Sequence, residues 1–208
     1  MLTRRHALTG LAALTGLAAV PAMAQGRAPD PNPVPPVIRK ALEQDPNAPA
    51  VGAAKPTAVM VEFFDYNCPY CRTAMPTVAR LLRADPALQL VLREWPVFGA
   101  GSVFAARAAL ASRAQGKYWA FHTALLQIRG PAEEATVMRT ARRVGLDEGQ
   151  LRADMDSQPV TDHIDQSELM ATHFGLIGTP TFIIGSRSTF GRPDEDELRG
   201  MIAAYRQG

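Results

Sequence analysis

The chain has 208 residues, of which 47 % are hydrophobic and 20 % are charged, a composition typical of a globular protein rather than a disordered or fibrous one. The formal net charge is only +2, so the sequence lacks the basic excess of a nucleic-acid-binding surface, and we expect no nucleic-acid partner. Two cysteines are too few for a disulfide-stapled scaffold or for a zinc site made of four cysteines from one chain.

The first 24 residues are predicted to be a signal peptide that is removed. Arg4 and Arg5 form a positive segment, residues 7–20 are apolar, and Ala22-Met23-Ala24 is a small-x-small cleavage signal. The apolar run is shorter than the roughly 20 residues that span a bilayer, so we expect no stable membrane insertion. Paired arginines occur in Sec signals and resemble the twin-arginine signal, so either route would deliver a secreted, periplasmic protein.

Residues 25–48 are predicted to form a Pro-rich tail followed by a short helix. Proline fixes φ and removes the N–H donor, and its density in residues 25–36 favours an extended segment. A helix over residues 37–44 would end at Asp45-Pro46. Residues 49–56 form a turn-rich approach to the main domain, which we place at residues 49–208.

The main domain opens with the pattern of a βαβ unit. Residues 58–64 form an apolar run with Glu62 as its only acid, which is typical of a strand buried on both faces. Cys68-Pro69-Tyr70-Cys71 follows, and the apolar residues after it recur at helical spacing as far as Asp85-Pro86. Residues 88–92 predict the second, parallel strand.

A helical block and a second set of strands complete the predicted fold. Ser102 is expected to cap the first helix of the block. The predicted helices cover residues 103–115, 118–128, 132–144, 147–156 and 160–174; strands at 181–184 and 189–190 and a helix at 195–205 follow. The order βαβ, helical block, ββα predicts an α/β fold with a helical insertion at about residues 101–175.

Two cysteines separated by two residues fit a redox-active dithiol, half of a metal site or a structural disulfide. A disulfide that closes so short a loop removes little entropy from the unfolded chain. A metal site needs further ligands at paired spacing, which His122, His163 and His173 do not show, so no metal is expected.

The redox-active dithiol is favoured because the pair lies at the junction of a strand and a helix. Cys68 occupies the predicted helix start, where unpaired N–H groups and the helix dipole lower a thiol pKa from ~8.5 toward about 3.5–7.5. Pro69 fits the first helical turn, where its missing N–H is not needed.

The ordered motifs resemble the DsbA-type disulfide oxidoreductases, which have a thioredoxin fold. The strand Val61-Glu62-Phe63-Phe64, the two cysteines and Gly178-Thr179-Pro180-Thr181 carry this resemblance. Arg93-Glu94-Trp95-Pro96 and Tyr118-Trp119-Ala120-Phe121-His122 resemble the branch of the family with a long insertion. The resemblance spans about residues 50 to 205 and implies a thioredoxin-like fold with an inserted helical subdomain.

The resemblance also implies roles for individual residues. Cys68 would be the exposed nucleophile and Cys71 the buried resolving thiol. Glu62 matches a buried acid that assists proton transfer at the second cysteine. Pro76 matches a proline that kinks the helix.

The substrate-binding residues implied by the resemblance lie on two loops. Pro180 matches a cis-proline that faces the disulfide, and Thr179 would present backbone groups to the substrate. Pro69 and Tyr70 would complete this surface.

Aromatic residues near the motif are expected to divide between rim and core. Tyr66 and Tyr70 are expected to form an exposed apolar rim beside the cysteines. His122 is expected to be a solvated helix residue, and Phe63, Phe64 and Trp119 are expected to belong to the core.

The sequence therefore predicts a periplasmic thiol–disulfide oxidoreductase that exchanges its Cys68–Cys71 disulfide with thiols of exported proteins through a mixed disulfide on Cys68. Reduced or misfolded exported proteins would be its substrates, a membrane redox partner would regenerate it, and no cofactor is expected. Two alternatives remain open: a disulfide isomerase or reductase kept reduced in the cell, and a non-enzymatic copper-binding thiol protein. Pro69-Tyr70 stands where strongly oxidising members carry Pro-His, which predicts a less oxidising potential.

Overall fold

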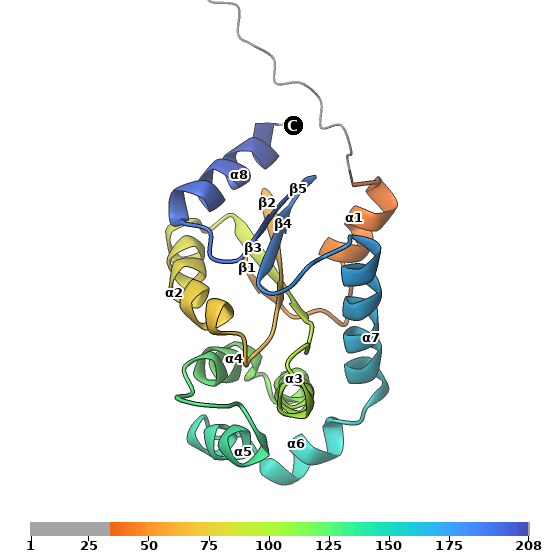
Figure 1. Ribbon diagram of the computed structural model, residues 1–208, viewed down its shortest axis with the longest axis vertical. Helices are drawn as coiled ribbons and strands as arrows, with labels where there is room; N and C mark the ends of the chain where they lie inside the picture. Colours follow the sequence, from red (N-terminus) through yellow and green to blue (C-terminus); the bar gives the residue numbers. More distant parts are fainter. Residues whose placement is uncertain (1–33, 208) are drawn as a thin grey trace, which may run out of the picture. The chain divides into compact units, whose positions relative to one another are not determined.

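The computed structural model describes residues 34–207, which form a mixed α/β structure around one sheet (Figure 1). The predicted signal peptide and residues 25–33 of the predicted tail lie outside the described residues. The strands are β1 (Ala50–Gly52), β2 (Ala58–Phe64), β3 (Leu88–Glu94), β4 (Thr181–Ile184) and β5 (Arg187–Phe190). The helices are α1 (Pro36–Glu43), α2 (Pro69–Ala84), α3 (Ala100–Ala111), η1 (Ser112–Gln115), α4 (Tyr118–Leu126), α5 (Glu134–Arg143), α6 (Glu148–Asp154), α7 (Gln158–His173) and α8 (Glu195–Gln207).

The sheet has the strand order β1-β3-β2-β4-β5 among the described residues. β2 and β3 are parallel and are joined by α2, which confirms the predicted βαβ unit. The other pairs are antiparallel. β1 was not predicted, because three residues at a sheet edge are too few to show a period-2 pattern.

Alternate side chains of β2 pack into two separate cores, because successive residues of a strand point to opposite faces. Ala58, Met60 and Phe64 join the core that includes residues of α2 and α8. Val59, Val61 and Phe63 join the core that includes residues of α1 and α7. Figure 1 shows the corresponding layers, with α2 and α8 on one side of the sheet and α1 and α7 on the other. The sequence of β2 is therefore almost entirely apolar because both faces of the strand are buried.

Helices α3 to α7 lie between β3 and β4 in the sequence, where the helical insertion was predicted. The expected capping role of Ser102 is wrong: α3 begins at Ala100 after Gly99, whose φ of 89° suits glycine. The Ser102 hydroxyl lies inside the helix and donates instead to Asp65. None of the helices within residues 34–207 has both the length and the apolar character needed to cross a membrane.

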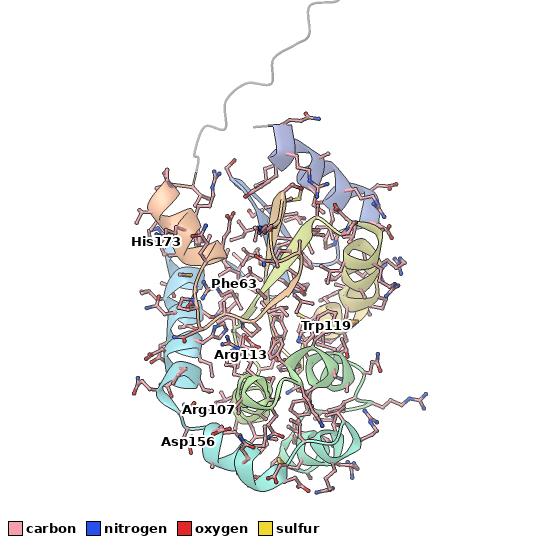
Figure 2. All side chains as sticks on the ribbon, turned by 180° about the vertical axis from the view of Figure 1, so that it is seen from behind. Phe63, Arg107, Arg113, Trp119, Asp156 and His173 are labelled. Atoms are coloured by element: carbon pink, nitrogen blue, oxygen red, sulfur yellow. The ribbon has the colours of Figure 1, made fainter. Side chains whose placement is uncertain are left out.

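Figure 2 labels side chains of the sheet and of the helical block. Phe63 lies in the interior and contacts Trp95 edge-on, with the ring centroids 6.4 Å apart. Arg107 of α3 forms a salt bridge of 3.2 Å with Asp156, which follows α6, and both are labelled in Figure 2. Because the Asp156 carboxylate is 89 % exposed, this pair contributes little to stability.

The buried guanidinium of Arg93 connects β3 to the N-terminal part of the described chain. Its Nη1 lies 2.6 Å from Asp45 Oδ2, and its Nη2 donates to the carbonyl oxygens of Ala41 and Leu42 at 2.5 and 3.0 Å. These bonds satisfy the last carbonyls of α1 and compensate the cost of burying the charge.

We predict that Arg93→Ala lowers the free energy of unfolding by about 3 kcal/mol, because it leaves the Asp45 carboxylate and the carbonyls at the end of α1 without their partner. Arg142→Ala, which removes an exposed salt bridge to Glu148, is the matched control and is expected to cost less than about 1 kcal/mol. Urea unfolding measures both. Equal losses in the two variants would contradict the role given to Arg93.

Candidate active site

The cysteine pair lies where β2 passes into α2. β2 ends at Phe64, and Cys68 is the N-cap of α2 in an extended conformation, with φ of −71° and ψ of 118°. Pro69 follows in the first turn, as predicted. Both cysteines are free thiols in this structure. Cys71 lies inside the first turn of α2, so the helix start holds both sulfur atoms on one short segment. Pro76 lies within the same helix.

The loop before β4 meets the helix start from a distant part of the sequence. The Thr179–Pro180 peptide bond is cis, as the resemblance implied. The Cys68 thiol donates a hydrogen bond to the Thr179 carbonyl oxygen at 3.1 Å. The fold thus brings Cys68, Thr179 and Pro180 together across more than a hundred residues.

The expectation that Cys68 is exposed is wrong for this structure. Only 1 % of its surface is accessible, because the N-cap position packs against the core and the Thr179 carbonyl covers the sulfur. Pro69 and Tyr70, in contrast, are exposed, and Tyr70 has 60 % of its surface accessible. The exposed surface at this site therefore comes from the two residues between the cysteines.

Hydrogen-bond donors around Cys68 lower its pKa to about 6 from an ordinary value of 9.0. The Cys71 thiol contributes most, burial opposes the shift, and the backbone N–H groups of Cys71 and Tyr70 add to it. The helix-start amides predicted from the sequence are thus present, but they are not the leading cause. The bond from the Cys68 thiol to the Thr179 carbonyl belongs to the protonated form and is lost on ionisation.

The pKa of Cys71 is shifted in the opposite direction, upward. Burial raises its pKa well above the usual range, and its hydrogen bond to Cys68 and the nearby Glu62 raise it further. At neutral pH the pair therefore holds a thiolate at Cys68 and a proton at Cys71.

Glu62 is a buried acid on the face of β2 that looks toward α2. It alternates with Met60 and Phe64, which belong to the core shared with Cys71. Burial, followed by the negative charge of Cys68, raises its pKa to about 8. Glu62 is consequently protonated at neutral pH.

Two expectations about the neighbouring aromatic residues are wrong, while others are confirmed. Tyr66 and His122 are both buried, and the Tyr66 hydroxyl lies 3.1 Å from His122 Nδ1. Burial lowers the pKa of His122 to about 3, so the ring is neutral. This partnership lets both polar side chains leave solvent. Tyr70 is exposed, Phe63 and Phe64 lie in the core, and Trp119 packs against it, as expected.

Sequence reasoning missed the polar residues of the β2–α2 loop. Asp65 is buried and accepts a hydrogen bond of 2.7 Å from Ser102, and the Asn67 side chain donates to the same hydroxyl at 3.0 Å. Short polar side chains directly after a strand are typical of turns that bond their own backbone. That signal is present in Asp65-Tyr66-Asn67, but the contact with α3 is not local and could not be inferred from it.

Among residues 34–207, no group of three or more histidine, cysteine or acidic side chains is arranged to hold a metal ion.

A Cys-x-x-Cys pair at the start of a helix, facing a cis-proline at the edge of a central sheet, defines a thioredoxin-like redox site. The comparisons with known proteins give the family. Residues 59–203 match the DSBA-like thioredoxin domain, and the chain belongs to this family of thiol–disulfide oxidoreductases.

Solved structures share the fold and, in one case, much of the sequence. A thioredoxin-like oxidoreductase from Silicibacter pomeroyi DSS-3 is 49 % identical, with a TM-score of 0.80 over 82 % of this chain and 98 % of that one. A periplasmic thioredoxin-like protein from Salmonella enterica serovar Typhimurium is 27 % identical, with a TM-score of 0.76 over 85 % and 100 %. The thiol-disulfide exchange protein α-DsbA2 from Wolbachia pipientis is 26 % identical, with a TM-score of 0.76 over 81 % and 92 %.

A curated relative is much longer than this chain. The Na(+)/H(+) antiporter NhaA 3 of Salinispora tropica is 31 % identical over 153 residues, which are 73 % of this chain and 24 % of that protein. The chain spans about a quarter of the length of the curated relatives it matches.

We predict that iodoacetamide alkylates Cys68 of the reduced protein with a pH midpoint near 6, because its thiolate is the reactive form. Cys71 is expected to stay unmodified in the folded protein. Cys71→Ala removes the leading donor to the thiolate and should raise the midpoint by about one pH unit. Alkylation rates measured by mass spectrometry across a pH series give both midpoints. A wild-type midpoint near that of free cysteine would contradict the lowered pKa of Cys68.

We also predict that burial of Glu62 destabilises the folded, reduced protein by an amount that depends on pH. Its folded pKa of about 8 exceeds its ordinary 4.5, so the reduced protein loses stability as pH rises from 4.5 to 8 and loses no more above that. Glu62→Gln lacks this titration, and the variant should become progressively more stable than wild type over that range, by up to about 1.4 kcal/mol for each pH unit. Urea unfolding at a series of pH values measures the difference, and two parallel profiles would refute the raised pKa.

Proposed function

We propose that this protein is a periplasmic thiol–disulfide oxidoreductase that forms disulfides in exported proteins, with Cys68 as the sulfur that bonds to the substrate. The observation that carries the proposal is the lowered pKa of Cys68 at the start of α2, next to the cis Thr179–Pro180 loop. A thiolate stabilised in the reduced protein makes the corresponding disulfide easier to reduce, and hence a better oxidant.

The first step is attack of a substrate thiolate on Cys68 Sγ of the Cys68–Cys71 disulfide. The bond between substrate sulfur and Cys68 forms, the bond between the two cysteines breaks, and Cys71 leaves with the electron pair. Because Cys71 is buried and its pKa is high, it needs a proton as it leaves. We propose that Glu62, protonated at neutral pH, donates this proton and recovers it from solvent.

The second step releases the oxidised substrate. A second substrate thiolate attacks the substrate sulfur of the mixed disulfide, a disulfide forms within the substrate, and Cys68 leaves as a thiolate. Its low pKa makes it the better leaving group. The substrate has lost two electrons, the protein has gained them, and a membrane redox partner would have to remove them.

Four residues are proposed to receive the substrate chain. Thr179 is buried and presents its carbonyl at Cys68, so its main chain is placed to bind the segment that carries the attacking cysteine. Pro180 fixes this loop, and the exposed Pro69 and Tyr70 offer apolar surface beside it. Because these contacts involve backbone and apolar groups, they suit many different unfolded or misfolded exported proteins.

The sequence at the N-terminus supports the proposed location. Residues 1–24 have the pattern of a cleaved signal peptide, and a similar solved structure is that of a periplasmic thioredoxin-like protein. The periplasm also keeps disulfides from being reduced.

Tyr70 favours a second candidate function within the same class. A neutral phenol side chain stands between the cysteines in place of an ionisable imidazole, which leaves the thiolate with less stabilisation. A disulfide isomerase or reductase, kept reduced in the cell, would use the same site in the opposite direction.

We predict that Cys71→Ser accumulates mixed disulfides with periplasmic proteins, because the variant keeps the reactive Cys68 and loses the thiol that resolves the bond. Cys68→Ser, the matched control, should accumulate none. Acid quenching, alkylation and non-reducing electrophoresis separate the two variants. The reverse pattern would mean that the two cysteines have been assigned each other's roles.

The direction of catalysis follows from equilibrium with glutathione. We predict a reduction potential more positive than about −200 mV, above the values at which reductant-type proteins lie. Quantifying reduced and oxidised protein across a series of glutathione buffers gives the value. A potential near that of thioredoxin, about −270 mV, would replace the oxidase with the reductase.

A further inference from the structure

Asp65 is a buried carboxylate that the proposed chemistry does not use. Oδ1 accepts hydrogen bonds from the Asn67 N–H at 2.6 Å and from the Ser102 hydroxyl at 2.7 Å. Oδ2 accepts from the N–H groups of Val97 and Phe98 at 2.7 and 3.0 Å. These four donors belong to the Cys68 loop, to the connection between β3 and α3, and to α3 itself. The carboxylate therefore joins three segments at one point.

The neighbouring Asn67 adds a second connection from the same loop to the helical block. Its amide nitrogen donates to Ser102 Oγ at 3.0 Å and to the Ala132 carbonyl at 3.2 Å. Its amide oxygen accepts from the Ala132 N–H at 2.7 Å. Both polar residues of the loop thus bond to the helical block, and Ser102 is shared between them.

The main chain of Asp65 contacts both cysteines. Its carbonyl oxygen accepts a hydrogen bond from the Cys68 N–H at 3.1 Å. The Asp65 main chain also lowers the pKa of the Cys71 thiol, against the larger effect of burial. Movement of this one residue would therefore change the position of Cys68 and the environment of Cys71 together.

The number of donors shows that the carboxylate is built into the site. Burial of an unpaired carboxylate is costly, and here each oxygen receives two hydrogen bonds. An apolar residue could fill the position without any partner, whereas the carboxylate imposes a specific arrangement on all four donors.

We propose that Asp65 is a positioning residue: its carboxylate fastens the Cys68 loop to the β3–α3 connection and to α3, and so sets the relative stability of the dithiol and the disulfide. The inference rests on the proposed function, because it concerns the redox equilibrium of that same pair. It assigns to the helical insertion a direct part in the properties of Cys68.

The test compares two variants that weaken the connection. Asp65→Asn keeps the shape of the side chain, but its NH₂ group cannot accept the two hydrogen bonds that one oxygen now receives. Ser102→Ala removes one of the four donors and leaves every charge in place. Asp147→Asn is the matched control, since Asp147 caps α6 by accepting from the Gln150 N–H at 2.8 Å.

The readout is the equilibrium constant with glutathione, with thermal stability measured beside it. Loosening the loop misaligns the donors at the Cys68 thiolate, so Asp65→Asn should make the pair about tenfold less oxidising and Ser102→Ala about threefold. Asp147→Asn should leave the constant unchanged. Loss of the Asp65 charge alone would stabilise the thiolate and shift the constant in the opposite direction.

Each outcome is decisive. An unchanged constant in both variants, or a more oxidising pair in Asp65→Asn, would overturn the positioning role whatever happens to stability. If Asp65→Asn does not fold, Ser102→Ala decides alone. If Cys71→Ser fails to accumulate mixed disulfides, the proposed function fails; the positioning role is then judged by whether Ser102→Ala raises the pH midpoint for alkylation of Cys68.

Discussion

The stabilised thiolate of Cys68 is the interaction on which the rest of the site depends. Cys71 and the first amides of α2 stabilise its sulfur as a thiolate. These donors are worth much more to an anion than to a sulfur bound in a disulfide, so they favour the reduced protein. The leading donor is the second cysteine itself, which means that the pair shares one proton in its reduced state.

The fold brings these donors together from distant parts of the chain. β2, buried on both faces, delivers the loop at residues 65–67 to the start of α2. The cis Thr179–Pro180 loop before β4 approaches from the neighbouring strand, since β4 pairs with β2. Asp65 ties the same loop to α3. The sheet and the helical insertion therefore meet at the cysteine pair.

Much of the fold is visible in the sequence because it is recorded in local patterns. The apolar run of β2 and the helical spacing after Cys71 identify the βαβ unit, and short motifs identify the cysteines and Pro180. The burial of Cys68, Tyr66 and His122 could not be read in this way, because it depends on partners far away in the chain. Tyr66 and His122 are 56 residues apart, and Asp65 and Ser102 are 37 apart. The three-residue β1 left no pattern at all.

The most direct test of the central claim is the difference in unfolding free energy between the reduced and oxidised proteins as a function of pH. Cys68 has a folded pKa of about 6 against an ordinary 9.0, so its contribution is complete above pH 9 and is lost as pH falls through 6. The oxidised protein lacks this titration. Because the Cys68 charge raises the pKa of Glu62 in the reduced protein alone, both forms are compared in the Glu62→Gln background. Between pH 6 and 9 the free energy of unfolding of the reduced form should therefore rise, relative to that of the oxidised form, by up to about 1.4 kcal/mol per pH unit. A difference that does not vary with pH would contradict the account.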